Sequence, residues 1–421
     1  MSLRDGFAPL GIRAFRTFWT GQLVSSVGDG MVPVVTAFTV LGAGGGATGL
    51  GAVLAVGMIC RVLAALIGGV LADRTSRRHQ MAGADAVRCA VQLGLGLLIT
   101  TGHDSAAVLA VGNGLYGIAA GFYGPASAGL VPALVERPML QQAAALQSLT
   151  RSSAMIAGPA VAGLLIPFTA PQVVYFIDAA SFAVNVTMLL RLTGIAVRAR
   201  TGRTFIADLV RGWHEVSARR WLLLNLLAHA AWNFGMATFF VLGPVLAQRH
   251  LGGSAAWGLV AAGMSAGSLA ASTLAMRWQP SRPLVAGNLA LTLAALPLLA
   301  LLGGLPAPVV ALAAAASNGG VVLLNALWDA TLQRVIPEDV LSRVSSYDTL
   351  FSLVSMPLGY ALVGPVAQHM GDSGTLLTAI SFAVLPCSLI CLLPTVRGVG
   401  RAEPETPLAD EAAQPAAAPK G

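Results

Sequence analysis

Two charged side chains inside long apolar segments are the strongest candidates for proton or ligand binding in this sequence. Asp29 lies near the middle of the first segment, about 19–41, and Arg61 lies at a matching depth in the second, about 48–71. If both segments cross a bilayer, each charge costs about 2.5–3.5 kcal/mol at its centre, and a pair within hydrogen-bond reach offsets much of both penalties. Such an aspartate can bind a proton or a cationic group, whereas a static pair only orients two helices. We therefore expect Asp29 and Arg61 to face each other.

Other charged residues in the apolar segments are weaker candidates for chemistry. Arg151 lies about two turns into the fifth segment, where its guanidinium requires a carboxylate, water or an anionic substrate. Asp85 and Arg88 are three residues apart, so we expect them to pair locally with a structural role. Asp178 stands toward the end of the sixth segment, and we expect its side chain to snorkel to the membrane surface.

The composition predicts that these segments are membrane spans. Of the 421 residues, 56% are apolar and 10% are charged, whereas soluble domains are about 45–50% apolar and about a quarter charged. The basic residues are 24 arginines and one lysine, Lys420, which cannot complete a P-loop or a Schiff-base site from the C-terminal tail. The cysteines and histidines are scattered, so we expect no metal, no cofactor and no enzyme activity. Arginines between apolar runs indicate topology rather than nucleic-acid binding.

Twelve apolar segments can be marked, each bounded by glycine, proline or charge. With the N-terminus in the cytoplasm, 21 of the 25 basic residues lie in cytoplasmic connections or tails, which fits the positive-inside rule. We therefore expect a multi-pass plasma-membrane protein with both termini in the cytoplasm, and the preference for arginine over lysine indicates a bacterial source. The expected segments are about 19–41, 48–71, 80–101, 106–131, 143–166, 172–192, 221–246, 255–276, 284–302, 308–333, 345–367 and 374–393.

A basic central loop divides these segments into two halves. Phe205, Leu209 and Trp213 recur at helical spacing in this loop, which favours an amphipathic helix on the membrane surface over a solvated connection. The expected regions are an N-terminal six-helix bundle at 1–192, a cytoplasmic linker at 193–220, a C-terminal six-helix bundle at 221–393 and a disordered cytoplasmic tail at 394–421.

A short motif between the second and third segments carries a family resemblance. Residues 69–78 read GVLADRTSRR, which resembles the signature loop of the major facilitator superfamily in residue types and in position. Four positions also align between the halves at a constant offset, as two related halves would. They are Leu140, Leu149, Gly158 and Gly163, which align with Leu341, Leu350, Gly359 and Gly364. The resemblance implies an all-α membrane protein with twelve transmembrane helices in two six-helix bundles.

The resemblance assigns a conformational latch to this signature loop. Its aspartate can satisfy free N–H groups at the start of a neighbouring helix and pair with an arginine, which holds the two halves in one state. A basic loop that serves only topology is the alternative. The expected latch residues are Gly69, Asp73, Arg74, Arg77 and Arg78.

A second motif lies in the fifth segment. Gly158, Pro159 and Gly163 resemble the glycine and proline motif of drug antiporters in this superfamily, and a proline in a membrane helix permits bending or close packing. Asn113 stands in the fourth segment where many proton antiporters of the superfamily carry an arginine, so the usual coupling residue is changed. With shorter phrases such as that at 333–337, these motifs resemble the branch of enterobactin exporters and macrolide efflux pumps.

The implied fold also places polar side chains of the second half around a central cavity. Amide and indole groups in an otherwise aliphatic wall suit an amphipathic or aromatic substrate, although a tryptophan in a membrane helix also serves as a packing residue or an interface anchor. The expected proton and substrate cavity comprises Asp29, Arg61, Asn113, Arg151, Trp232, Asn233, Asn325 and Trp328.

The sequence therefore predicts a secondary active transporter that works as a monomer in the bilayer. We expect it to export amphipathic small molecules, such as drugs, antibiotics or siderophore-like compounds, by proton antiport with alternating access between the bundles. The same features are compatible with an importer or facilitator of this fold. They are also compatible with a membrane scaffold or sensor that has lost transport.

Overall fold

The computed structural model describes residues 7–192, 213–336 and 338–399, and all regular structure in these ranges is helical. Long apolar runs form the helices, and glycine, proline or charged residues stand at most of their ends. The elements are η1 (Ala8–Gly11), α2 (Arg13–Gly42), α3 (Gly46–Arg74), α4 (Arg77–Thr100), α5 (Ala106–Leu134), η2 (Arg137–Met139), α6 (Leu140–Leu165), α7 (Pro171–Leu190), α9 (Arg220–Leu246), η3 (Ala247–Leu251), α10 (Ser254–Ala275), α11 (Pro283–Leu291), η4 (Thr292–Ala294), α12 (Ala295–Leu302), α13 (Ala307–Val335), α14 (Glu338–Ile390) and α15 (Pro394–Arg397).

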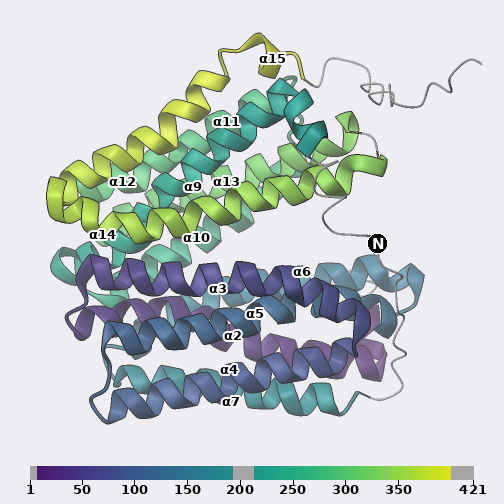
Figure 1. Ribbon diagram of the computed structural model, residues 1–421, viewed down its shortest axis with the longest axis vertical. Helices are drawn as coiled ribbons and strands as arrows, with labels where there is room; N and C mark the ends of the chain where they lie inside the picture. Colours follow the sequence, from purple (N-terminus) through teal and green to yellow (C-terminus); the bar gives the residue numbers. More distant parts are fainter. Residues whose placement is uncertain (1–6, 193–212, 337, 400–421) are drawn as a thin grey trace, which may run out of the picture.

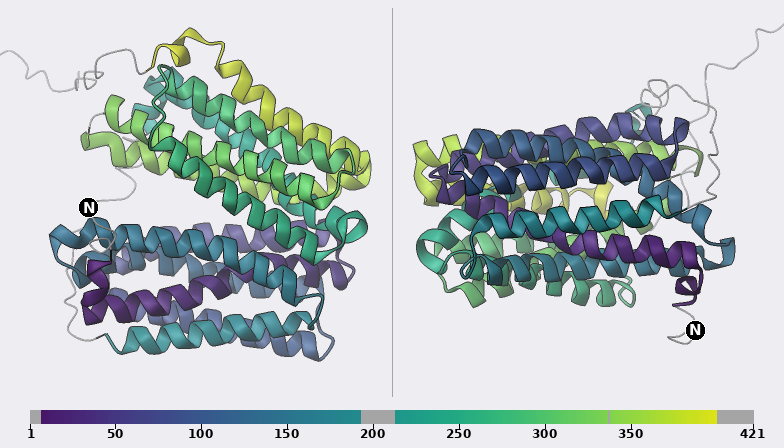
Figure 2. Two further views of the ribbon diagram at one scale, coloured as in Figure 1. Left: turned by 180° about the vertical axis from the view of Figure 1, so that it is seen from behind. Right: turned by 90° about the horizontal axis from the view of Figure 1, so that it is seen from below.

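The helices form two bundles that lie one above the other in Figure 1. The lower bundle contains α2 to α7, in which α3 packs against α5, α2 packs against α6 and α7, and α4 packs against α7. The upper bundle contains α9 to α15, in which α9 packs against α14 and α10 packs against α13. The helices within each bundle run side by side in all the views of Figures 1 and 2.

Ten helical stretches of the described residues are long and apolar enough to cross a membrane. One of them, in α14, is interrupted at Gly371, whose φ of 69° lies in the region that favours glycine, and the chain turns back there in Figure 1. Another helix, α6, is not among the ten, because glutamine and serine residues lower the hydropathy of its first half. With α14 counted twice and α6 included, the arrangement fits the twelve expected crossings.

The two bundles touch through small residues near the end at which α14 turns back. A Cβ added at Gly364 would lie 2.4 Å from Thr48 Cα, and one at Gly163 would lie 2.8 Å from Gly258 Cα, so glycine permits these close approaches. Gln368 Nε2 also donates a 2.9 Å hydrogen bond to Thr48 Oγ1. In Figure 1 the bundles converge on this side and diverge toward the opposite side, on which α3 ends and α4 begins.

The expected linker and tail fall partly outside the described residues. The expected amphipathic helix begins in the range 193–212, which is outside them, but residues 213–218 are helical and the Trp213 ring lies 5.7 Å from the ring of Tyr347 in α14. The segment expected to be disordered from residue 394 begins with the short helix α15, whose Val396 is buried. Residues 400–421 lie outside the described part of the chain.

Candidate functional site

A cavity of about 500 Å³ lies between α2, α3, α5 and α6 of the first bundle and Tyr360 of α14. Most of its wall is apolar or small, so the few polar side chains decide what it can bind. Four of the eight predicted cavity residues line it, and sequence reasoning missed four further polar residues, among them Tyr116. The polar and charged side chains in its wall are those of Ser26, Asp29, Thr36, Arg61, Asn113, Tyr116, Arg151 and Tyr360.

The carboxylate of Asp29 pairs with Arg88 rather than with Arg61. Arg88 Nη1 lies 3.7 Å from Asp29 Oδ2, and the Tyr116 hydroxyl donates a hydrogen bond to Asp29 Oδ1. Among the described residues no ion pair to Arg61 is formed, so the expected Asp29–Arg61 pair is wrong. The physical reason is that equal depth in two helices does not make two side chains face each other, and the long side chain of Arg88 reaches Asp29 from α4.

Arg88 also joins the cavity to the interior of the first bundle. Its guanidinium contacts the Asp85 carboxylate, which is the local pair that the sequence predicted. The carbon at the centre of this guanidinium lies 4.5 Å from the ring centroid of Tyr123 and 4.3 Å from that of Phe182, which adds cation–π contacts. Because Arg88 also reaches Asp29, its role is wider than the local structural one that we expected.

A buried polar network continues from Asp85 toward α7 and α2. Asn185 Nδ2 donates to Asp85 Oδ2 at 2.6 Å and to the Tyr123 hydroxyl at 3.1 Å, and Gln22 Nε2 donates to the same hydroxyl. A Cβ added at Gly21 would lie 2.4 Å from Asn185 Oδ1, so this glycine lets α7 approach α2. Buried polar groups of this kind require partners, and here the network connects four helices, α2, α4, α5 and α7.

Asp178 in α7 is buried inside the bundle, and the expectation that it snorkels to the surface is wrong. Gln92 Nε2 donates a 2.5 Å hydrogen bond to Asp178 Oδ2, and the Ser181 hydroxyl lies 3.3 Å from Asp178 Oδ1. A Cβ added at Gly28 would lie 2.5 Å from Asp178 Oδ1, so α2 leaves room for the carboxyl group. The side chain therefore stabilises packing between α4, α7 and α2.

Asn113 and Arg151 line the cavity through local contacts. Asn113 Nδ2 donates a 2.8 Å hydrogen bond to the Val53 carbonyl oxygen, which fixes α5 against α3. Arg151 Nη2 donates a 3.2 Å hydrogen bond to Gln147 Oε1, one turn earlier in α6. The amide of Asn113 is therefore used in helix packing, whereas the guanidinium of Arg151 is paired only with a neutral group in the described part of the chain.

The four predicted cavity residues of the second half do not line this cavity. Trp232 Nε1 donates to the Leu291 carbonyl oxygen at 3.0 Å, and Asn233 Nδ2 donates to the His229 carbonyl oxygen at 2.9 Å. Trp328 is buried, and its Nε1 donates to Asp348 Oδ2 at 3.1 Å, whereas the Asn325 side chain is exposed. The two tryptophans thus have the packing role that was the alternative for them.

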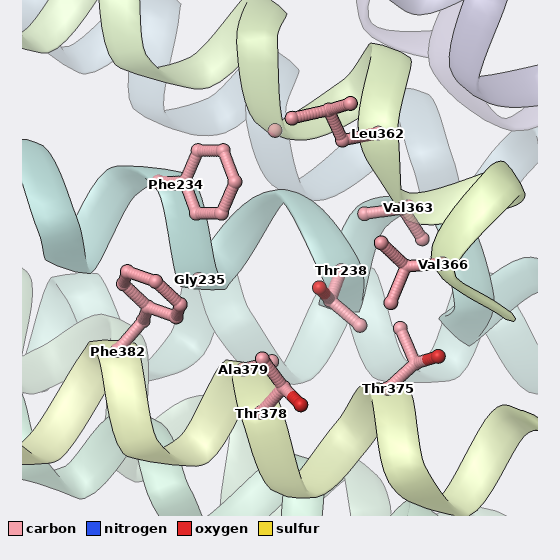
Figure 3. Close-up of a pocket in the computed structure, with 11 residues that line it drawn as sticks. Phe234, Gly235, Thr238, Leu362, Val363, Val366, Thr375, Thr378, Ala379 and Phe382 are labelled. Carbon is pink, nitrogen blue, oxygen red and sulfur yellow. The ribbon is translucent and has the colours of Figure 1, made fainter. Parts of the chain in front are cut away.

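A second, much smaller cavity of about 40 Å³ lies inside the C-terminal bundle between α9 and the two parts of α14 (Figure 3). Phe234 and Phe382 lie near one end, and Thr238, Thr375 and Thr378 supply its hydroxyl groups. Each of these three hydroxyls is on a helix, and those of Thr375 and Thr378 donate to backbone carbonyls of their own helix. This space is close to the volume of one or two water molecules, so it is too small for a drug-sized substrate.

The described residues of the signature loop and of the fifth-segment motif lie at contacts between helices. Arg77 Nη1 donates to the Gly129 carbonyl oxygen at 2.6 Å, and Arg78 donates to the Leu192 carbonyl oxygen, so both arginines bind the first bundle. The side chains at positions 73 and 74 and the environment of Gly69 lie outside the described part, so the latch remains a prediction.

A Cβ added at Gly158 would lie 2.4 Å from the backbone of Gly30, which shows close packing of α6 on α2 next to Pro159.

Comparisons with solved structures show the same fold. The nucleoside transporter NupG gives a TM-score of 0.72 at 11% identity and covers 90% of this chain and 98% of its own. A bacterial homologue of the human lysosomal transporter Spinster, in an inward-facing and unoccupied conformation, gives a TM-score of 0.68 at 13% identity and covers 97% of this chain and 100% of its own. These likenesses confirm the predicted fold class.

Comparisons with characterised proteins show the family. The chain is 27% identical over 347 residues to the enterobactin exporter EntS of Shigella boydii serotype 18, which covers 79% of each protein. It is 24% identical over 383 residues to the macrolide efflux protein A of Streptococcus pyogenes, which covers 87% of this chain and 94% of that protein. A model of the family described as transmembrane secretion effector matches residues 4–414. The protein is therefore a multi-pass membrane transporter of the major facilitator superfamily and belongs to its transmembrane secretion effector family.

Proposed function

We propose that this transporter exports amphipathic small molecules in exchange for protons, by alternating access between its two bundles. The observation that carries the proposal is Asp29, whose side chain is 46% exposed in the cavity wall and is held by Arg88 and Tyr116. An ionisable group at membrane depth that faces a cavity is suited to proton exchange. The relatives named for enterobactin export and macrolide efflux support export as the direction.

Arg88 provides the link between protonation and packing. When Asp29 takes up a proton, its attraction for Arg88 falls, and Arg88 keeps its contact with Asp85. A proton thus changes the contacts between α2 and α4, which gives the two protonation states different preferences for conformation. One proton moving down about 100 mV supplies roughly 2.3 kcal/mol, and one pH unit adds roughly 1.4 kcal/mol.

The contacts between the bundles and the charge of the loops support the proposed sidedness. The bundles meet near Gly364 and diverge at the opposite end, where the arginines of the connections after α3 and α5 lie. By the positive-inside rule this side faces the cytoplasm, with both termini there and the plasma membrane as the location. The signature loop at 69–78 also lies on this side, where a latch would hold the bundles together once the cavity opens outward.

Uptake into inside-out membrane vesicles tests proton-driven export. With an acidic lumen, the unmodified protein should accumulate a fluorescent amphipathic substrate, and an uncoupler should release it. Asp29→Asn should abolish accumulation against a gradient while substrate exchange down a gradient persists. The matched control is Asp372→Asn, which removes an exposed carboxylate paired with Arg249 at 3.0 Å, and it should behave as the unmodified protein.

Three results would contradict parts of the proposal. Accumulation that survives both the uncoupler and Asp29→Asn would show that Asp29 does not carry the coupling proton. Proton-driven movement only in the opposite direction would indicate an importer. A lack of resistance to every compound of a substrate panel, in a bacterium deleted for its own pumps, would favour a scaffold or sensor.

A further inference from the structure

Two guanidinium groups in the cavity wall have no acidic partner among the described residues. Arg61 comes from α3 and Arg151 from α6, and both side chains are exposed. Arg151 donates a 3.2 Å hydrogen bond to the neutral side chain of Gln147. No ion pair joins either arginine to a carboxylate in the described ranges.

The carboxylate of the cavity does not balance these two charges. Asp29 is engaged by Arg88 at 3.7 Å and by the hydroxyl of Tyr116. The wall therefore presents two guanidiniums that have no acidic partner in the described part of the chain and one carboxylate that already has partners. A guanidinium stays charged at physiological pH and offers only donors, so water or an anion must satisfy it.

The position of the two arginines suits a single bound molecule. Because α3 packs against α5 and α6 packs against α2, the two guanidiniums come from the two helix pairs that form the wall. Apolar side chains line the same cavity, among them Leu54 and Met58 of α3 and Met155 of α6. The planar donor fork of arginine matches a carboxylate, and an apolar wall buries the body of a drug-sized ligand.

We propose that the cavity selects amphipathic anions, with a carboxylate of the substrate held by Arg61 and Arg151 and its apolar body against α3 and α6. The inference rests on the proposed function, because it names the substrate class of the same site. An anion of this kind does not compete with the proton for Asp29. A cationic molecule in the same cavity would be repelled by the two positive charges, so the arginines also disfavour the binding of cations.

Dye binding to the purified full-length protein in detergent tests this selectivity. Fluorescein and rhodamine 123 share a xanthene frame, but near neutral pH fluorescein carries a carboxylate, whereas rhodamine 123 is a cation with an esterified carboxyl group. Fluorescence polarisation should show fluorescein binding at least about tenfold more tightly. Arg61→Gln and Arg151→Gln should each weaken fluorescein binding by about tenfold, the loss expected for one charge-assisted contact, and leave rhodamine 123 binding no weaker.

Controls separate charge from folding. Arg249→Gln removes a guanidinium that forms an exposed ion pair with Asp372 and does not line the cavity. This variant should change the affinity for neither dye. Arg61→Lys and Arg151→Lys keep the charge, and each should retain part of the preference for fluorescein.

The result that would overturn the anion site is equal or tighter binding of rhodamine 123 by the unmodified protein. Equal loss of both dyes in a glutamine variant that melts at the normal temperature would also overturn it. Binding is measured without a proton gradient, so its outcome is separate from that of transport. Selective dye binding without proton-driven movement would support the anion site and contradict the proposed antiport.

Discussion

The guanidinium Nη1 of Arg88 lies 3.7 Å from the carboxylate of Asp29, so a side chain of the cavity wall is joined directly to the buried interior of the first bundle. On its other side the same guanidinium contacts Asp85, which is fully buried. One cation is thus shared between an accessible carboxylate and a buried one. A change in the charge of Asp29 therefore alters the electrostatic environment of Asp85 through Arg88.

Removal of Arg88 should destabilise the protein strongly. Arg88→Gln leaves Asp85 without a cation in a buried site, and loss of one partner of a buried pair costs about 3–5 kcal/mol. The double variant Arg88→Gln with Asp85→Asn should recover much of this loss, because no uncompensated charge remains. Thermal unfolding of the purified protein in detergent measures both effects.

Arg249→Gln is the control for the Arg88 experiment. Its ion pair with Asp372 is largely exposed, so its loss should change stability by less than about 1 kcal/mol. A double variant no more stable than Arg88→Gln alone would show that the Asp85 charge is not what Arg88 balances.

Close packing of α2 on α7 should depend on Gly28. A Cβ there would lie 2.5 Å from both Asp178 Oδ1 and Ser181 Oγ, so Gly28→Ala should force these side chains to move and lower stability by about 1–3 kcal/mol. Gly94→Ala in α4 meets nothing within 4 Å and should be neutral or stabilising, because alanine has the higher helix propensity. Equal melting temperatures for the two variants would exclude this packing constraint.

The fold and half of the cavity could be predicted from the sequence because both depend on patterns along single helices. Apolar segments, arginine placement and the signature motif define the bundles. A charge that is costly in lipid must face the interior, which is why Asp29, Arg61 and Arg151 were found, whereas Asn113 was found from its position in the family motif.

The pairing within the site could not be predicted, because it depends on which way each helix is rotated about its axis. Asp29 and Arg61 match in depth, yet α4 brings Arg88 to Asp29 instead. Asp178 was assigned to the membrane surface because it stands toward the end of its segment, but the rotation of the helix places it on the inner face. The tryptophans of the second half were ambiguous for the same reason.

The carboxyl group of Asp178 should be replaceable by an amide but not by a hydrocarbon. In Asp178→Asn the side-chain oxygen can still accept the hydrogen bond from Gln92, which is 2.5 Å long in the structure, so stability should change little. Asp178→Leu leaves the buried amide of Gln92 without its acceptor, which costs about 1–3 kcal/mol. Unfolding temperatures of the two variants, compared at equal expression, measure the difference. A leucine variant as stable as the asparagine variant would contradict the role of this hydrogen bond.

The contact between Gly364 and Thr48 should control access to the cavity from the side proposed to face outward. A Cβ at Gly364 would lie 2.4 Å from Thr48 Cα and 2.7 Å from its backbone nitrogen, so Gly364→Ala can be accommodated only if α14 and α3 move apart. Thr36 lines the cavity but is buried, which makes a cysteine at that position a reporter of opening.

In a background with Cys60→Ala and Cys89→Ala, the reporter Thr36→Cys should react slowly with a membrane-impermeant maleimide that is added to intact cells. Addition of Gly364→Ala should raise this labelling rate several-fold, because it disfavours the state in which the bundles meet at their outer ends. Gly83→Ala, whose Cβ meets nothing within 4 Å, should leave the rate unchanged. A rate that is the same with and without Gly364→Ala would show that this contact does not close the cavity. Fast labelling of Thr36→Cys alone would place the open side of the cavity outside the cell.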